Sequence, residues 1–133
     1  MKKLLIISYW IGIIADAAAT VLLFMPNVAA SVLQPQPFEM SDVYLYVTRV
    51  AGALMLGWTV LLFWAVLRPI ERSDILLITL VPVVTLLAVA AALVARSKQI
   101  PISNLLPMFC LYIAVYCTYI PSYIWAKKQQ RSL

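Results

Sequence analysis

Hydrophobic residues form four long runs along this chain, and short polar segments separate them. The runs cover 4–25, 43–67, 75–95 and 105–126, and Asp16 and Arg49 are the charged residues inside them. Runs of 21 to 25 residues reach about 31–38 Å as helices, enough to cross a hydrocarbon core of about 30 Å. The runs do not alternate hydrophobic and polar residues as barrel strands do. The pattern therefore predicts an all-α fold of four transmembrane helices, with residues 1–133 as one domain.

The polar connections are short, and their length predicts how the helices are arranged. Helices joined by few residues pack as antiparallel neighbours, so we predict an up-down bundle. The longest connection, 26–42, contains three prolines, and its apolar stretch 27–33 is suited to a short helix at the membrane interface. Pro82 and Pro121 lie inside the third and fourth runs, where each removes a backbone hydrogen bond and is expected to bend its helix.

Composition agrees with a membrane location, and charge predicts the orientation. The chain is 65% hydrophobic and 11% charged, whereas soluble domains average about 45–50% apolar and about 25% charged residues. Seven basic residues fall at one end of the predicted bundle and two, Arg96 and Lys98, at the other. The seven are Lys2, Lys3, Arg68, Arg72, Lys127, Lys128 and Arg131. The positive-inside rule then places both termini in the cytoplasm and predicts a multi-pass protein of the inner or plasma membrane.

The start of the chain also has features of a signal peptide. Lys2 and Lys3 precede an apolar stretch, and small residues flank Asp16. The apolar run nevertheless continues to Met25. We therefore expect this segment to be kept as the first transmembrane helix.

Asp16 and Arg49 are the first candidates for a functional site. Asp16 is expected about 13 Å, and Arg49 about 9 Å, below the outer surface. Because an unpaired charge in hydrocarbon is costly, we predict an ion pair between them. One interpretation is a structural pair that sets the register of two helices. The other is a site where protonation of Asp16, or an anion at Arg49, is coupled to binding.

Small residues on the first two helices predict close helix packing. Ser8, Gly12, Asp16 and Thr20 are spaced by four on the first helix. Gly52 lies on the second helix, and Ala53 and Gly57 there are also four apart. Such spacing lets two helix backbones approach each other. We expect these two stripes to face each other.

Aromatic residues on the fourth helix form the last candidate feature. Steps of three and four place five of them on one face: Phe109, Tyr112, Tyr116, Tyr119 and Tyr123. A hydroxyl at mid-membrane needs a partner, so Tyr116 and Tyr119 should point into the bundle or across an oligomer interface. The face is either a packing seam or the wall of a cavity for a planar or cationic ligand. The ligand-binding candidates are Asp16, Arg49, Tyr112, Tyr116 and Tyr119.

Other chemistry has little support in the sequence. Histidine is absent, and neither a metal-ligand cluster nor a phosphate-binding glycine loop is present. Cys110 and Cys117 lie seven apart on one helix, or about 10 Å, which exceeds the reach of a disulfide. We therefore expect no catalytic residue, no metal and no cofactor, and no nucleic acid as a partner.

The segment that opens the second helix resembles a known group of membrane proteins. The residues are Arg49-Val50-Ala51-Gly52-Ala53, then Gly57-Trp58 and Arg68-Pro69-Ile70-Glu71-Arg72. With the chain length and helix count, they are similar to small prokaryotic four-helix membrane proteins of the DoxX-like type. That resemblance implies a four-helix fold and an accessory or assembly role near respiratory or redox enzymes. Small multidrug transporters also have a carboxylate in the first of four helices, but the residues around Asp16 do not match their motif.

Two functions follow from these features, and a third, an intramembrane enzyme, has the least support because no nucleophile or metal constellation is present. The first is a non-catalytic accessory or assembly subunit, whose partners are the lipid bilayer and a homo-oligomer or another membrane protein. The alternative is a protein that binds or transports a small ligand or ion through the Asp16–Arg49 pair and a tyrosine-lined cavity. The first predicts continuous packing at these residues, and the second predicts a pocket there.

Overall fold

The computed structural model describes residues 1–33, 41–98 and 100–132, and these ranges contain helices and no strand. In chain order the elements are α1 (Lys2–Phe24), α2 (Pro26–Leu33), α3 (Asp42–Val66), α4 (Asp74–Ile78), the π-helix η1 (Thr79–Val84), α5 (Thr85–Ser97) and α6 (Ile102–Gln130). Since α4, η1 and α5 run on without a break, Asp74–Ser97 is one span. Four helices are thus long and apolar enough to cross a membrane, as the sequence predicted.

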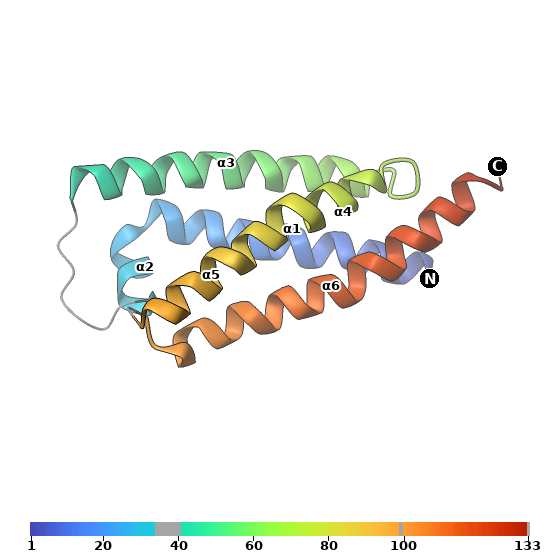
Figure 1. Ribbon diagram of the computed structural model, residues 1–133. Helices are drawn as coiled ribbons and strands as arrows, with labels where there is room; N and C mark the ends of the chain where they lie inside the picture. Colours follow the sequence, from blue (N-terminus) through green and yellow to red (C-terminus); the bar gives the residue numbers. More distant parts are fainter. Residues whose placement is uncertain (34–40, 99, 133) are drawn as a thin grey trace.

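The four spans form an up-down bundle (Figure 1). Both termini and the 67–73 connection lie at one end, which we call the terminal end, and α2 lies at the other, the α2 end. α1 is central, since it packs most extensively against α3 and then against α6. The predicted antiparallel bundle and the short helix in the first long connection are both confirmed.

Local sequence explains where the helices begin and end. The Ser41 hydroxyl accepts a hydrogen bond from the Tyr44 amide at 3.2 Å and caps the start of α3. Pro26 opens α2, where a missing amide proton costs nothing. α5 ends at Ser97, and Lys98 then adopts a left-handed backbone with φ of 58°. The fourth helix runs beyond the predicted 126 to Gln130, so its last turn is polar and basic.

Pro82 changes the backbone pattern of the third span. It lies inside η1, where hydrogen bonds reach one residue further than in an α-helix. The Thr85 hydroxyl donates to the Leu80 carbonyl five residues earlier, at 3.0 Å. The Leu80 carbonyl also accepts the Thr85 backbone amide, so the hydroxyl adds a second hydrogen bond in the segment that the proline disturbs. Pro121 lies inside α6, which the structure assigns as one α-helix.

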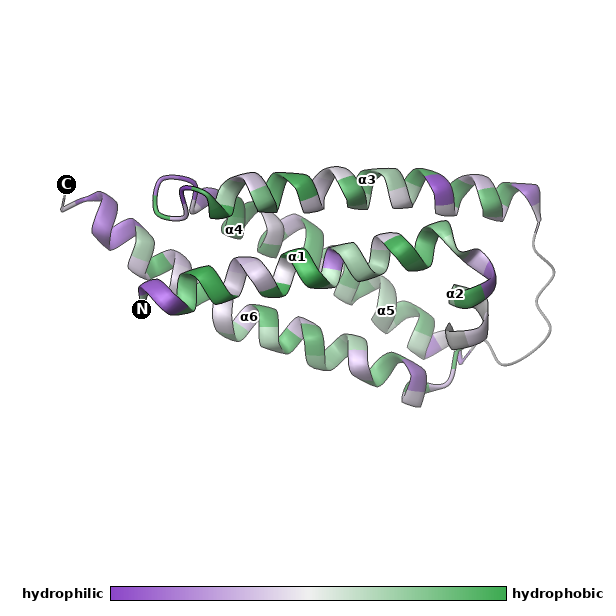
Figure 2. Ribbon diagram, turned by 180° about the vertical axis from the view of Figure 1, so that it is seen from behind, coloured by the Kyte–Doolittle hydropathy of each residue, from purple (hydrophilic) through white to green (hydrophobic). Residues whose placement is uncertain are grey.

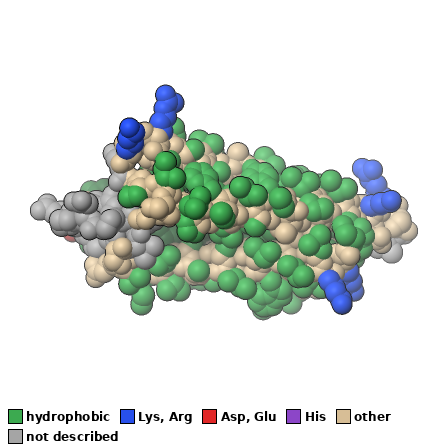
Figure 3. Space-filling view, turned by 90° about the horizontal axis from the view of Figure 1, so that it is seen from below, with side chains coloured by type: hydrophobic (Ala, Val, Ile, Leu, Met, Phe, Trp, Pro, Cys, Tyr) green, Lys and Arg blue, Asp and Glu red, His purple; other side chains and the backbone are tan. Residues whose placement is uncertain are grey.

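Large hydrophobic side chains cover the outside of the bundle, and the core between the helices is small. Green hydrophobic stretches fill the middle of the helices in Figure 2, and Lys and Arg side chains lie towards the ends of the face drawn in Figure 3. All four spans contribute side chains to the core. Its largest buried side chains include Leu5, Tyr9, Leu62, Leu76 and Tyr119. An apolar exterior of this kind suits lipid, because lipid chains solvate such side chains as well as a core does.

Candidate functional site

Asp16 and Arg49 are not paired in the structure. The ion pairs among the described residues are Arg68–Glu71 and Lys127–Asp74. The Asp16 side chain is half-buried on α1 and Arg49 is exposed on α3, and no hydrogen bond joins them. The predicted Asp16–Arg49 ion pair was therefore wrong for this conformation of the chain.

The reason is the rotation of α3 about its own axis. Thr48 and Gly52 are buried on α3, and the Phe24 ring lies 3.1 Å from the position that a Gly52 Cβ would occupy. Each helical residue advances the face by about 100°, so Arg49 follows Thr48 off the buried side. Asp16 and Arg49 were expected at similar depths in the membrane, as an ion pair requires. Arg49 nevertheless lies on the exposed face of α3, and this position excludes the pair.

Asp16 instead lies beside a tyrosine from α6. Tyr119 is 1% exposed, and its hydroxyl lies 2.1 Å from the position that a Gly12 Cβ would occupy. Asp16 is one turn further along α1 on the same side as Gly12, so its carboxylate lies near the Tyr119 hydroxyl without a hydrogen bond to it. The Tyr119 hydroxyl has no hydrogen-bond partner within the described residues. Gly12, Asp16 and Tyr119 thus form a small polar centre, which we call the Asp16–Tyr119 centre.

The other aromatic residues of α6 have separate neighbours. The Tyr116 hydroxyl lies 2.6 Å from the Thr85 hydroxyl and links α6 to α5. The Phe109 and Tyr112 rings meet edge to face, with centroids 6.3 Å apart. Tyr123 lies near the terminal end, with the Lys127 ammonium 5.9 Å from its ring centre. Of these contacts, the Tyr116–Thr85 pair joins two helices and the other two lie within α6. The open groove that the structure describes is lined by Tyr123 and not by Tyr112, Tyr116 or Tyr119.

Ala53 and Gly57 lie on the outside of α3, although the sequence led us to expect them against α1. Both are exposed, and no atom within the described bundle lies within 4 Å of a Cβ built on Gly57. Gly12 and Gly52, in contrast, are buried in helix contacts. Arg49, Ala53 and Gly57 are spaced by four and share one exposed side, which we call the α3 outer face.

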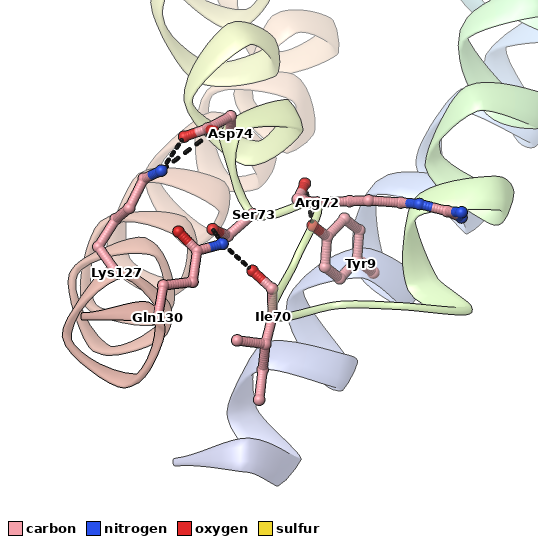
Figure 4. A network of polar contacts seen from close by, with 7 residues as sticks. All are labelled: Tyr9, Ile70, Arg72, Ser73, Asp74, Lys127 and Gln130. Atoms are coloured by element: carbon pink, nitrogen blue, oxygen red, sulfur yellow. Dashed lines mark hydrogen bonds and ion pairs between the residues drawn. The ribbon is translucent and has the colours of Figure 1, made fainter. Parts of the chain in front are cut away.

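A network of polar contacts holds the terminal end together (Figure 4). The Tyr9 hydroxyl of α1 donates to the Arg72 carbonyl at 2.9 Å. The Gln130 amide of α6 donates to the Ile70 carbonyl and reaches the Ser73 hydroxyl at 3.4 Å. Helices from both ends of the chain thereby satisfy carbonyls of the tight connection between the second and third spans. This network is structural, since each contact satisfies a backbone group or a buried hydroxyl.

Two basic residues extend the same network. The Arg72 guanidinium lies 3.4 Å from the centre of the Trp64 ring and donates to the Trp64 carbonyl. The Lys127 ammonium lies 2.8 Å from an Asp74 carboxylate oxygen. Beside Lys127, an open groove runs along the end of α6; its lining residues are Tyr123, Ile124, Lys127, Lys128, Gln130 and Arg131. This basic groove was not anticipated as a site, although the basic residues at this end were counted for orientation.

The sequence analysis named Ser8 only for close helix packing and did not anticipate its contact with a buried serine of α6. The Ser8 and Ser122 hydroxyls lie 2.9 Å apart between α1 and α6. Ser8 also donates to the Thr118 carbonyl at 3.2 Å. The available signal was the spacing of Thr118, Ser122 and Ala126, which follow one another by four like the small residues of α1.

Comparisons of the chain with protein-family models, curated proteins and solved structures returned no match.

Proposed function

We propose that this chain is a non-catalytic accessory or assembly subunit of the inner or plasma membrane that acts by lateral association with another membrane protein. Both termini would be cytoplasmic, because the terminal end contains seven of the basic residues and the α2 end two. The DoxX-like resemblance implies the same class of role. Four apolar spans with short connections leave little surface outside the membrane for a catalytic site.

The observation that supports this function best is the α3 outer face. α3 is the least buried of the four spans, and Arg49 projects from it about seven residues, or about 10 Å, into the helix. A guanidinium in contact with lipid alone is costly unless it reaches the interface or a partner. One turn and two turns further in, Ala53 and Gly57 leave room for another helix backbone. A helix that supplies an acceptor for Arg49 and packs over Gly57 would satisfy both features.

Site-specific photocrosslinking in native membranes tests this proposal. A photoreactive residue at position 57 is expected to produce a discrete crosslinked protein species, and Arg49→Ala is expected to reduce its yield. The matched control is the same residue at position 90, because Ala90 is also small and exposed but lies on α5. Crosslinks to lipid alone from position 57, or equal protein yields from both positions, would contradict association through α3.

A second function, binding of a small cation, has one specific observation in its favour. The Tyr119 hydroxyl is fully buried and without a partner, next to the half-buried Asp16 carboxylate. A buried hydroxyl of this kind costs about 1–3 kcal/mol unless it is hydrogen-bonded. A cation held by Asp16, with the tyrosine oxygen as a further ligand, would offset that cost.

Equilibrium dialysis with sodium ions, a small cation that carboxylate and hydroxyl oxygens can ligate, tests this second function on the purified protein in detergent. Binding by Asp16 predicts saturable uptake that falls at least tenfold in Asp16→Asn and is unchanged in Arg49→Gln. Uptake without saturation, or equal uptake by Asp16→Asn and the unmodified protein, would remove this candidate. Neither outcome affects the crosslinking test at α3.

A further inference from the structure

The outward side of α6 changes from apolar to basic along a single stripe. Ile113, Ile120 and Ile124 are exposed by 64%, 46% and 61%, and they share one helix face. Further steps of four and three along the same face lead to Lys128 and Arg131, which are also exposed. The apolar part would contact lipid chains, and the basic part begins where the helix leaves the apolar span.

The basic part of this stripe borders the open groove at the terminal end. Lys127 lines the groove and is held in place by Asp74, whose carboxylate offsets its charge. Lys128 and Arg131 form no ion pair with any residue that the structure describes. The groove therefore combines one ion-paired ammonium with two positive charges that no described carboxylate offsets.

Neighbouring residues give the groove one apolar side. Tyr123 and Ile124 line it towards the membrane, and Gln130 lines it near the connection, to which its amide is hydrogen-bonded. Ile124 and Arg131 are seven residues apart, or about 10 Å along α6. A phospholipid has the same order of groups, with an acyl chain followed within a short distance by a charged phosphate.

We propose that this groove binds the headgroup of an anionic phospholipid. Lys128 and Arg131 contact the phosphate, Lys127 supplies a further donor at the rim, and an acyl chain follows Ile124 and Ile120. Arginine and lysine are the side chains that recognise phosphate through charge-assisted hydrogen bonds. The site is local to α6, because Lys2 and Lys3 are basic and exposed at the same end but do not line the groove. This proposal does not depend on association through α3.

Lipid binding to the purified protein can be measured by native mass spectrometry. The probes are dioleoyl phosphatidylglycerol and, as the comparison with a zwitterionic headgroup of no net charge, dioleoyl phosphatidylcholine. The test variant is Lys128→Gln with Arg131→Gln, and the matched control is Lys2→Gln with Lys3→Gln, which removes the same charge at the same end. Each basic residue at an anionic surface contributes about 1 kcal/mol, so the test variant should bind phosphatidylglycerol roughly 30-fold more weakly.

The control should bind phosphatidylglycerol within about twofold of the unmodified protein, since its lysines lie outside the groove. Excess inorganic phosphate should not displace the lipid, because free phosphate lacks the acyl chain that contacts Ile124. Equal weakening in both double variants would show a general charge effect and overturn the site. Equal affinity for the two lipids, or full displacement by phosphate, would overturn it as well. Circular dichroism of each variant excludes loss of fold as the cause.

Discussion

Replacement of Gly12 by alanine tests the contact between α1 and α6. The new Cβ would lie 2.1 Å from the Tyr119 hydroxyl and 3.1 Å from a Leu62 methyl carbon. The hydroxyl would have to move by roughly 1.3 Å to reach an ordinary contact distance. Because the Tyr119 ring is rigid and 1% exposed, the whole ring must move within a packed interior. Overpacking of this kind costs about 1–3 kcal/mol.

Two further variants isolate this steric cost. Gly57→Ala is the matched control, because a Cβ there meets no atom within 4 Å in the described bundle. It should be neutral or stabilising by up to about 1 kcal/mol, which is alanine's advantage in helix propensity. Tyr119→Phe removes the hydroxyl and leaves the ring carbon, 3.5 Å away, as the nearest atom of this side chain to the new Cβ. In that background the 3.1 Å contact with the flexible Leu62 side chain remains, so Gly12→Ala should cost less than about 1 kcal/mol relative to Gly57→Ala.

Unfolding of the purified variants in mixed detergent micelles, followed by circular dichroism during SDS titration, gives the free energies. We expect Gly12→Ala to be less stable than Gly57→Ala by about 1–3 kcal/mol, and a coupling of similar size with Tyr119→Phe. Tyr119→Phe alone should be neutral or stabilising, since it deletes a buried hydroxyl without a partner. If Gly12→Ala and Gly57→Ala have the same stability, Tyr119 does not lie over Gly12.

Three further measurements test other contacts. A double-mutant cycle of Asp16→Asn with Arg49→Gln, measured in the same unfolding assay, should give a coupling free energy below about 0.5 kcal/mol, because the two side chains are not paired. A larger favourable coupling would show that Asp16 and Arg49 do form an ion pair. Thr85→Val should destabilise by about 1–3 kcal/mol, since the Tyr116 hydroxyl loses this partner while the Leu80 carbonyl keeps the Thr85 backbone amide, whereas equal stability would show that water or another group replaces the Thr85 hydroxyl. Tyr9→Phe should cost about 0.5–1.5 kcal/mol, because one hydrogen bond to the Arg72 carbonyl is lost while the Ile75 amide still donates to it, and unchanged unfolding would show that the Tyr9 hydrogen bond contributes nothing to stability.

The sequence alone determined the number and approximate limits of the spans. Hydrophobic length is a property of each segment by itself, so the four runs could be recognised without knowledge of their neighbours. The predicted up-down order followed from the short connections, and the inward direction of Tyr119 followed from its mid-membrane hydroxyl. Pro82 was anticipated only as the cause of a bend, because the sequence shows the missing amide proton and not the backbone hydrogen-bond pattern that the π-helix adopts around it.

Only the tertiary structure decided which residues of different helices meet. Asp16 and Arg49 have similar expected depths, but packing of Gly52 against Phe24 turned Arg49 outward and left Tyr119 as the neighbour of Asp16. The contact between Tyr9 and the Arg72 carbonyl spans 63 positions in the chain and has no local signal. Rotation of a helix by one residue, about 100°, changes every lateral contact but leaves its hydrophobicity and length unchanged. For that reason the sequence determined the spans, and steric fit between helices decided the site.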